Sequence, residues 1–225
     1  MTGKKLLATI AAALLPGMAV GLGVMSAHSA ARQRPPREIL PDARPLSERL
    51  LPDDTDVTIK GKHVRPLTVQ PPKGTSQVEW ALQSESAVVV TLTQALPSLT
   101  EERNWIQTQW TATVDDLLRL FPGAPFSVGS SFTFVIDSGD LQVGKVAVHA
   151  RYGWARELVL GQKYLLFVRW IEGTQRVLVG PDTEYRVLAD GSLELADKTA
   201  DEVSGRPLTQ VASEIRKWVL EHPGR

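Results

Sequence analysis

The chain has 225 residues, and its 25 basic and 25 acidic side chains cancel to a formal net charge of 0. It contains no cysteine, which excludes disulfides and a lipidated amino-terminal cysteine, so an ordinary hydrophobic core must stabilise the fold. The balanced charge, without a basic cluster, argues against a nucleic-acid-binding protein.

Residues 1–31 have the pattern of an export signal. Lys4 and Lys5 precede a charge-free run over 6–27, and the small residues Ser29 and Ala31 follow at the positions of a cleavage site. The run is also long enough to remain as an uncleaved anchor, because a transmembrane helix needs about 20 apolar residues. We favour cleavage. In both cases the rest of the chain is expected outside the cytoplasm. After cleavage it would be periplasmic or secreted, and without cleavage it would be tethered to the membrane by residues 6–27.

Residues 32–77 are predicted to form an extended, semi-rigid linker. The segment is rich in proline and charged residues and has no aromatic side chain. Each proline removes a backbone donor and disfavours helix at the residue before it. Two stretches, 56–60 and 63–69, have the pattern of short edge strands. The linker would hold the following domain away from a membrane or a partner.

Residues 78–197 are predicted to form a β-rich domain, because apolar and polar residues alternate with a period of two. The predicted strands are 80–96, 105–118, 132–136, 145–152, 164–171, 176–179, 184–188 and 192–195, with 114–121 as an alternative helical turn. The stretch 164–171 is apolar on both faces, as a central strand would be. Asp190-Gly191 predicts a hairpin turn between the last two strands. Short antiparallel strands of this kind, with no long helix among them, indicate a small barrel or sandwich.

Residues 198–225 are predicted to hold an amphipathic helix and a tail. Pro207 opens a pattern in which Leu208, Val211, Ile215 and Trp218 recur at spacings of three and four. We expect this apolar stripe to pack on the barrel rather than on a membrane or a partner, since small sheets need such a cover.

The segment 160–168, Leu-Gly-Gln-Lys-Tyr-Leu-Leu-Phe-Val, is followed by a hairpin and a Val179-Gly180 step. It resembles the "GerYLlFL" signature of exported bacterial proteins with a netrin-like or TIMP-like OB barrel. The resemblance covers about residues 78–195 and implies a closed five-stranded antiparallel barrel with a carboxy-terminal helix, a scaffold used mostly for binding. Tissue inhibitors of metalloproteinases act through an amino-terminal cysteine held by disulfides. That activity is not implied here, because the chain has no cysteine.

Residues typical of catalysis or metal binding are scattered along the sequence. The histidines are His28, His63, His149 and His222. They fall in the signal, the linker, a strand and the tail, so no zinc site is expected. Asp137 and Asp140 are interpreted as turn residues rather than calcium ligands. No serine lies on the glycine-flanked turn of a hydrolase. The sequence therefore predicts no catalytic residue, no metal and no cofactor.

One cluster is predicted to bind a ligand. Arg151, Tyr152 and Trp154 end a half-exposed strand and enter the loop before 160–168. Flat aromatic rings beside guanidinium groups suit sugar rings, peptides or carboxylates. In the alternative interpretation, the aromatic residues cap the barrel end while the arginines pair with Glu157 or with aspartates.

The leading hypothesis is a non-enzymatic extracytoplasmic binding or interaction module, whose partner is an envelope protein, a peptide or a glycan. Two alternatives stay open: an envelope hydrolase whose site forms only in three dimensions, and a structural subunit of an envelope complex. A cleft that gathers His149 with a carboxylate and a hydroxyl would favour the hydrolase, and an exposed aromatic patch would favour binding. A helix stripe left uncovered by the barrel would favour the subunit.

Overall fold

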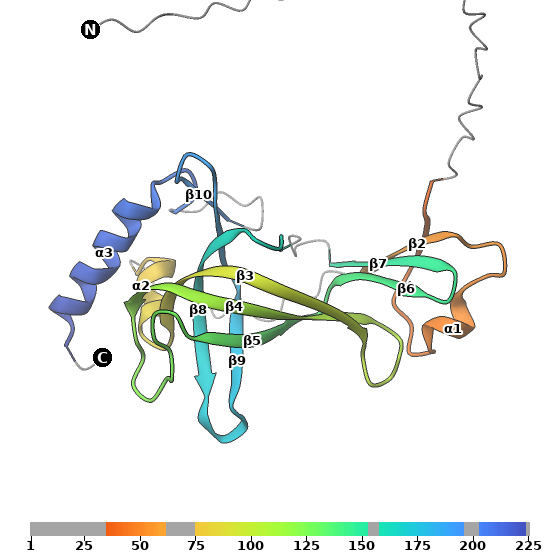
Figure 1. The fold of residues 1–225 in the computed structure, drawn as a ribbon, viewed down its shortest axis with the longest axis horizontal. Coiled ribbons are helices and arrows are strands. Elements are labelled where there is room, and N and C mark those ends of the chain that lie inside the picture. Colours follow the sequence, from red (N-terminus) through yellow and green to blue (C-terminus); the bar gives the residue numbers. More distant parts are fainter. Residues whose placement is uncertain (1–34, 62–74, 153–157, 196–202, 224–225) are drawn as a thin grey trace, which may run out of the picture. The chain divides into compact units, whose positions relative to one another are not determined.

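The computed structural model describes residues 35–61, 75–152, 158–195 and 203–223. These residues form a six-stranded sheet, a four-stranded sheet and three α-helices (Figure 1). The elements in chain order are β1 (Arg37–Ile39), α1 (Leu46–Arg49), β2 (Asp56–Gly61), α2 (Gln77–Leu82), β3 (Ser86–Leu99), β4 (Ile106–Arg119), β5 (Ser131–Ile136), β6 (Gly139–Val143), β7 (Val146–Tyr152), β8 (Lys163–Ile171), a 3₁₀ turn (Glu172–Thr174), β9 (Arg176–Val187), β10 (Leu193–Leu195) and α3 (Leu208–Glu221). The predicted mainly β fold with a carboxy-terminal helix is confirmed.

The large sheet has the strand order β10-β9-β8-β3-β4-β5 and is antiparallel throughout. β8 lies inside the sheet, and its residues from Tyr164 to Val168 are all buried. Both faces of this strand are covered because one core cluster lies on each side of the sheet. The central strand predicted from its apolar run is therefore confirmed.

The prediction of a closed barrel is wrong. The sheet curls until β5 comes close to β9, but no ladder joins these two strands in the described part of the chain. The hairpin turn at Asp190-Gly191, where Gly191 has a φ of +82°, brings β10 back onto the outer edge of β9. β10 pairs there with residues Tyr185 to Val187, so this part of the edge that closure would need is already occupied.

Part of the predicted linker is folded. β1 and β2 form the small sheet together with β7 and β6, in the order β1-β2-β7-β6. β2 was expected as an edge strand, yet it lies between β1 and β7 and runs parallel to both. The prolines do not prevent this, because those at 35–61 lie between the elements rather than inside the strands. The second predicted linker strand, 63–69, lies outside the described residues.

The small sheet packs on the far end of the β3–β4 hairpin. Its inner side chains, among them Val57 and Val148, share a core cluster with Ile106, the first residue of β4, and with Trp105, which precedes that strand. Trp105 Nε1 donates a hydrogen bond to the Asp137 carbonyl at 2.8 Å, just before β6. The two sheets are thus joined by apolar packing and by a hydrogen bond from a side chain to a backbone carbonyl.

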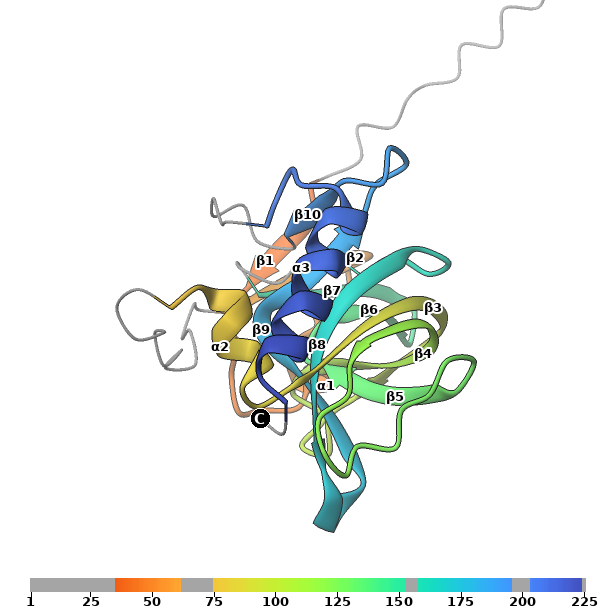
Figure 2. The ribbon, with the colours of Figure 1, turned by 90° about the vertical axis from the view of Figure 1, so that its left-hand side faces the viewer.

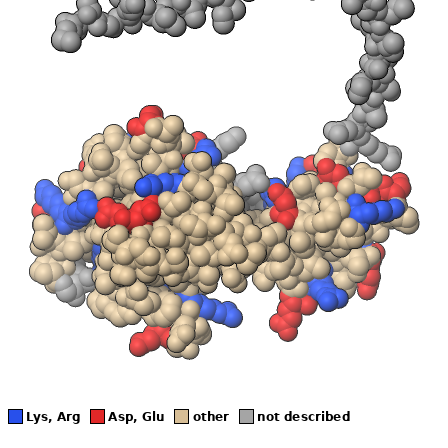
Figure 3. Space-filling model, viewed as in Figure 1, with Lys and Arg blue, Asp and Glu red and all other residues tan. Residues whose placement is uncertain are grey.

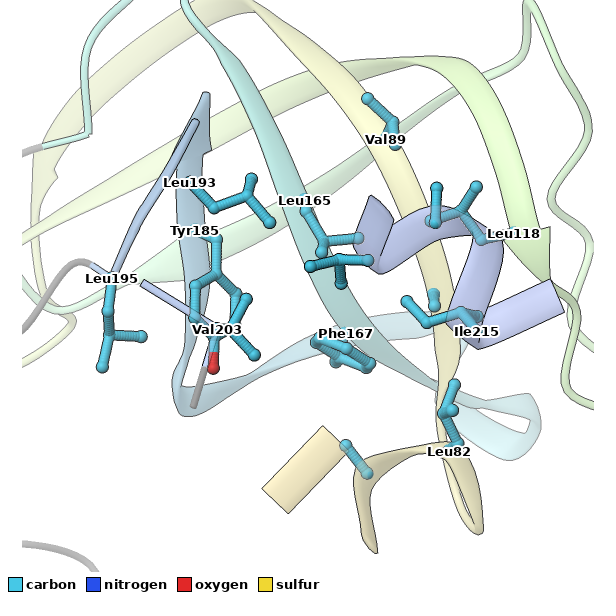
Figure 4. Packing of buried hydrophobic residues seen from close by; sticks show 14 residues of the cluster. Leu82, Val89, Leu118, Leu165, Phe167, Tyr185, Leu193, Leu195, Val203 and Ile215 are labelled. Carbon is cyan, nitrogen blue, oxygen red and sulfur yellow. The ribbon is translucent and has the colours of Figure 1, made fainter. Parts of the chain in front are cut away.

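The two longer helices cover the outer face of the large sheet at one end. Figure 4 shows Leu165 and Phe167 of β8 facing Ile215 of α3 and Leu82 of α2. The predicted helix after Pro207 is confirmed, and its residues Val211, Ala212 and Ile215 are buried against the sheet. None of the helices in the described ranges is long and apolar enough to cross a membrane, and the apolar run 6–27 lies outside those ranges.

Two strand predictions at β3 are wrong. Trp80 lies in α2 rather than in a strand, because Ser76 and Glu79 form a capping box that starts a helix there. At its other end, β3 continues past Pro97 to Leu99 instead of stopping at the proline. Pro97 is tolerated because this part of β3 pairs only with β4, and β8 pairs with β3 only as far as Thr91.

Candidate functional site

The ligand site predicted from the sequence is only partly described. Arg151 lies near the end of β7, and Tyr152 is the last residue of that strand. The side chain of Tyr152 and the whole of Trp154 lie outside the described residues. Arg151 itself binds protein groups: Nη2 is 2.6 Å from Oδ1 of Asp140, and Nη1 donates to the Gly139 carbonyl at 3.1 Å. This pairing of the arginine with an aspartate is the one that the alternative interpretation expects, and ligand binding by the three residues stays a prediction.

His149 lies between two carboxylates on the outer face of the small sheet. β6 and β7 form a hairpin in which Asp140 stands opposite His149. Nδ1 of His149 is 2.6 Å from Oδ1 of Asp140. On the other side, Nε2 is 3.2 Å from Oδ1 of Asp56 on β2, a contact whose geometry falls short of a hydrogen bond. His149 therefore links three strands of the small sheet through its side chain.

The carboxylate of Asp140 accepts hydrogen bonds from the side chains of both His149 and Arg151. Partial burial alone would raise its pKa, but the hydrogen bonds from His149 and Arg151 and the charge of Arg151 outweigh burial and lower the pKa. An ionised carboxylate can only accept hydrogen bonds, so Nδ1 of His149 carries the proton of this contact. The side chains of His149, Asp140 and Arg151 remain 29–47% exposed, and such half-exposed pairs contribute little stability each.

This arrangement does not resemble a nucleophilic catalytic site. In a triad, the imidazole nitrogen that faces away from the carboxylate must reach a hydroxyl. Here Nε2 of His149 faces the carboxylate of Asp56, although Thr58 is its register partner on β2. Within the described ranges, no group of three histidine, aspartate or glutamate side chains converges as metal ligands would. The His149 cluster is a salt-bridge network on a sheet face.

A second surface differs sharply from this charged one. From the row Thr91, Thr113 and Ser131 to the tip of the β3–β4 hairpin, the outward side chains of β3, β4 and β5 include no aspartate, glutamate, lysine or arginine; the next outward residue of β4 beyond that row is Asp115. We call these residues the uncharged face: Thr91, Thr93, Gln94, Leu96, Ser98, Gln107, Gln109, Thr111, Thr113, Ser131, Thr133 and Val135. Figure 3 shows the corresponding area, where β3, β4 and β5 face the viewer, without charged side chains.

Cross-strand pairing places the uncharged face in rows. Leu96, Gln109 and Val135 form one row across the three strands, and Leu96 and Val135 are 48% and 51% exposed. In the neighbouring rows, hydroxyl and amide groups bind one another: Thr113 and Ser131 are 3.0 Å apart, and Thr111 donates to Gln94 at 3.4 Å. The face is therefore an internally ordered surface with two apolar side chains beside a glutamine.

Charged residues return at the border of this surface. Lys163 of β8 lies 3.1 Å from Asp115 of β4, and Thr91 donates to the same carboxylate at 2.7 Å. In a chain with 22% charged residues, a face of this size should hold about three charged side chains. Their absence from these rows distinguishes the uncharged face from its border at Asp115 and Lys163.

The chain matches no protein-family model, no curated protein and no solved structure. The resemblance to the exported OB-barrel proteins therefore rests on the residues of 160–168 and the strand order alone.

Neither the uncharged face nor the His149 network was predicted. The residues Val143-Gly144-Lys145-Val146 could have indicated the β6–β7 hairpin, because a glycine at the first position of a two-residue turn supplies the positive φ, here +61°. That hairpin places Asp140 opposite His149. The uncharged face had a weaker signal: the outward positions of the two predicted strands 105–118 and 132–136 are mostly Thr, Ser and Gln.

Proposed function

We propose that the protein is a non-enzymatic extracytoplasmic interaction module that binds another envelope protein through the uncharged face. The observation that carries the proposal is the lack of charged side chains among the outward residues of the uncharged face, which spans three adjacent strands. The cores of protein–protein interfaces are depleted of charged residues, because each charge buried without a partner must lose its hydration.

The composition of the face favours a protein over a glycan. None of its residues is aromatic, so it offers no ring on which a sugar could stack. Leu96 and Val135 provide apolar contact area beside Gln109. The hydrogen bonds among its hydroxyl and amide groups hold the side chains in place before binding, which reduces the entropy lost on association.

The two alternatives have less support. A hydrolase would need His149 to face a hydroxyl, and its Nε2 faces the carboxylate of Asp56. A subunit docked through the carboxy-terminal helix would need a bare apolar stripe, yet Val211, Ala212 and Ile215 are buried against the sheet. Export to the envelope, and kinship with the proteins that carry the GerYLlFL-type motif, are parts of the same proposal.

Site-directed crosslinking tests this proposal well, because the chain has no cysteine of its own. A benzophenone label is attached to a single cysteine at Leu96 or Val135 in the full-length protein, and at Val128 or Leu178 as controls of similar exposure. After irradiation in the native envelope, we expect one partner band from positions 96 and 135 and none from the controls. Adding Gln109→Lys should abolish that band.

Two results would contradict the proposal. The first is no band, or the same band from all four positions. The second is a band that survives Gln109→Lys but disappears when Arg151, Tyr152 and Trp154 are all changed to alanine. That second result would move the interaction to the cluster predicted from the sequence.

A further inference from the structure

The described residues contain a groove between α2 and α3, away from the uncharged face. Figure 2 shows α2 on one side of α3, and β4 and β5 on the other. The apolar lining of the groove consists of Val78 and Leu82 from α2 and Val211, Ile215 and Trp218 from α3; Val78 and Trp218 are partly exposed, and the other three side chains are buried beneath them. We propose that this groove binds an apolar side chain in an extended, basic segment of another protein.

The size of the groove favours a single side chain over a small-molecule ligand. Its volume is about 210 Å³. Pockets for drug-sized ligands and cofactors have volumes of roughly 300 to 1,000 Å³. An apolar side chain from a peptide is the kind of group that a short apolar groove of this size accepts, and the rest of the peptide then lies along the two helices.

Trp218 is held in place at one end of the groove. Its ring stacks on the ring of His222 with centroids 4.5 Å apart. The guanidinium of Arg119 also lies over the Trp218 ring, 5.6 Å from its centroid. Arg119 is only 3% exposed and donates to the Glu85 carbonyl at 2.5 Å. A half-buried aromatic side chain that is already fixed loses little entropy on binding, as the anchors of protein interfaces do.

The charged residues around the groove favour basic residues on either side of the bound apolar side chain. Glu79 of α2 and Glu214 of α3 line the groove, and the single cation among its lining residues, Arg206, is already bound to Glu214. The Glu79 carboxylate accepts a hydrogen bond from the Ser76 backbone N–H. The rim therefore has a net negative charge, which is complementary to lysine or arginine in the bound segment.

A peptide series tests the groove with the full-length protein. The probe is a fluorescein-labelled nonapeptide in which one leucine is flanked on each side by two lysines. We expect saturable binding by fluorescence anisotropy, about tenfold or more weakened when serine replaces the leucine. Replacement of the lysines by glutamates should also weaken binding, and this difference should shrink at high salt.

A variant that fills the groove provides the decisive comparison. Val78→Trp should abolish binding of the lysine peptide, whereas Val128→Trp, at a 63% exposed position outside the groove, should leave the Kd unchanged. Unchanged binding by a folded Val78→Trp variant would overturn the proposal, and so would equal affinities for the lysine and glutamate peptides at low salt.

Methyl NMR of the wild-type protein keeps the test valid if Val78→Trp does not fold. The peptide should shift the methyl signals of Leu82 and Val211 and leave those of Val57 and Val148, in the core of the small sheet, unchanged. Shifts confined to other regions would also overturn the proposal. None of these measurements depends on the uncharged face, so the two proposals can fail separately.

Discussion

Arg37 binds the carboxylate of Asp54 with two hydrogen bonds, from Nε to Oδ1 at 2.8 Å and from Nη2 to Oδ2 at 2.5 Å. The same carboxylate accepts the backbone N–H of Leu51 at 2.7 Å, and Asp54 is only 7% exposed. The pair fastens β1 to the turn that precedes β2. It adds to the β1–β2 and β2–β7 ladders and to the apolar packing of Leu46, Val57 and Ile59, which also hold residues 35–61 in the small sheet.

Asp54 makes the stability of the protein sensitive to acid. The hydrogen bond from Arg37 lowers its pKa below the value of about 3.9 in an unfolded chain, and outweighs the opposing effect of burial. Its contribution to the free energy of unfolding is therefore complete above about pH 4 and is lost as the pH falls through the lower folded-state pKa. Urea unfolding between pH 7 and pH 2.5 measures this loss.

The variant Asp54→Asn separates this pair from other acidic groups. We expect it to lose about 2 kcal/mol at pH 7, because the bonds to a charged partner are weakened, and to vary less with pH below 4. Glu102→Gln removes one exposed carboxylate and is the control for net charge. Parallel pH profiles of Asp54→Asn and the wild type would show that the pair is not the source of the acid sensitivity.

Glu85 has the opposite effect on stability. Burial raises its pKa, with Arg169 at 3.4 Å opposing this only weakly, and its Oε2 is buried without a hydrogen-bond partner. The protonated form favours the fold, so its contribution is complete below the unfolded-state pKa and is lost as the pH rises through the higher folded-state value. We expect Glu85→Gln to be as stable as the wild type or more stable at pH 8. A clear loss of stability, measured by thermal unfolding, would contradict this.

Asp140→Asn should have a small effect on stability. The substitution removes the negative charge of the carboxylate that both His149 and Arg151 contact. Because these side chains are 29–47% exposed, we expect the free energy of unfolding in urea at pH 7 to fall by only about 0.5–1 kcal/mol. Gln142→Ala, at another exposed position of β6, is the control and should be neutral. A loss of several kcal/mol would mean that the network, rather than the apolar packing beneath it, stabilises the small sheet.

Gly139 lies where β6 meets β4. It has a φ of +148°, and a Cβ there would lie 2.2 Å from Oγ1 of Thr108, the hydroxyl that donates to the Ser138 carbonyl. We expect Gly139→Ala to cost about 2 kcal/mol or more. Gly144→Ala is the matched control, because its φ is +61° but nothing lies near its Cβ, so it should cost only about 1 kcal/mol.

A double variant identifies the cause of the Gly139 effect. If the Thr108 hydroxyl is the obstacle, Gly139→Ala should cost less in a Thr108→Ala background than in the wild type. Equal costs in both backgrounds would attribute the effect to the backbone conformation alone. Urea unfolding of the four proteins in the cycle provides the comparison.

Local patterns predicted much of the large sheet. β8 could be recognised because its residues are apolar on both faces, and β4 because Trp110, Ala112 and Val114 alternate with threonine and glutamine. α2 was missed although Ser76 and Glu79 carry the signature of a helix start. The closed barrel was wrongly predicted because closure depends on which strand reaches the edge of β9, and β10 occupies part of that edge.

The small sheet and the candidate surfaces depend on contacts between distant parts of the sequence. β1 has only three residues, and Arg37 on this strand binds Asp54, a contact that no periodic pattern reveals. The contact of His149 with Asp56 requires the parallel pairing of β2 with β7. The uncharged face appears only when β3, β4 and β5 are placed in register, because its residues look ordinary within each strand.

The pairing of β2 with β7 also determines the order in which the protein can fold. Asp56 stands opposite Ala147, about ninety residues later in the chain, and proteins are synthesised from the amino terminus. Until β7 has been synthesised, β2 can pair only with the three-residue β1, and one edge of β2 stays open. An apolar strand with an open edge is prone to pair with other chains. Aggregation of newly made protein should thus begin at β2, the strand that is made early and completed late.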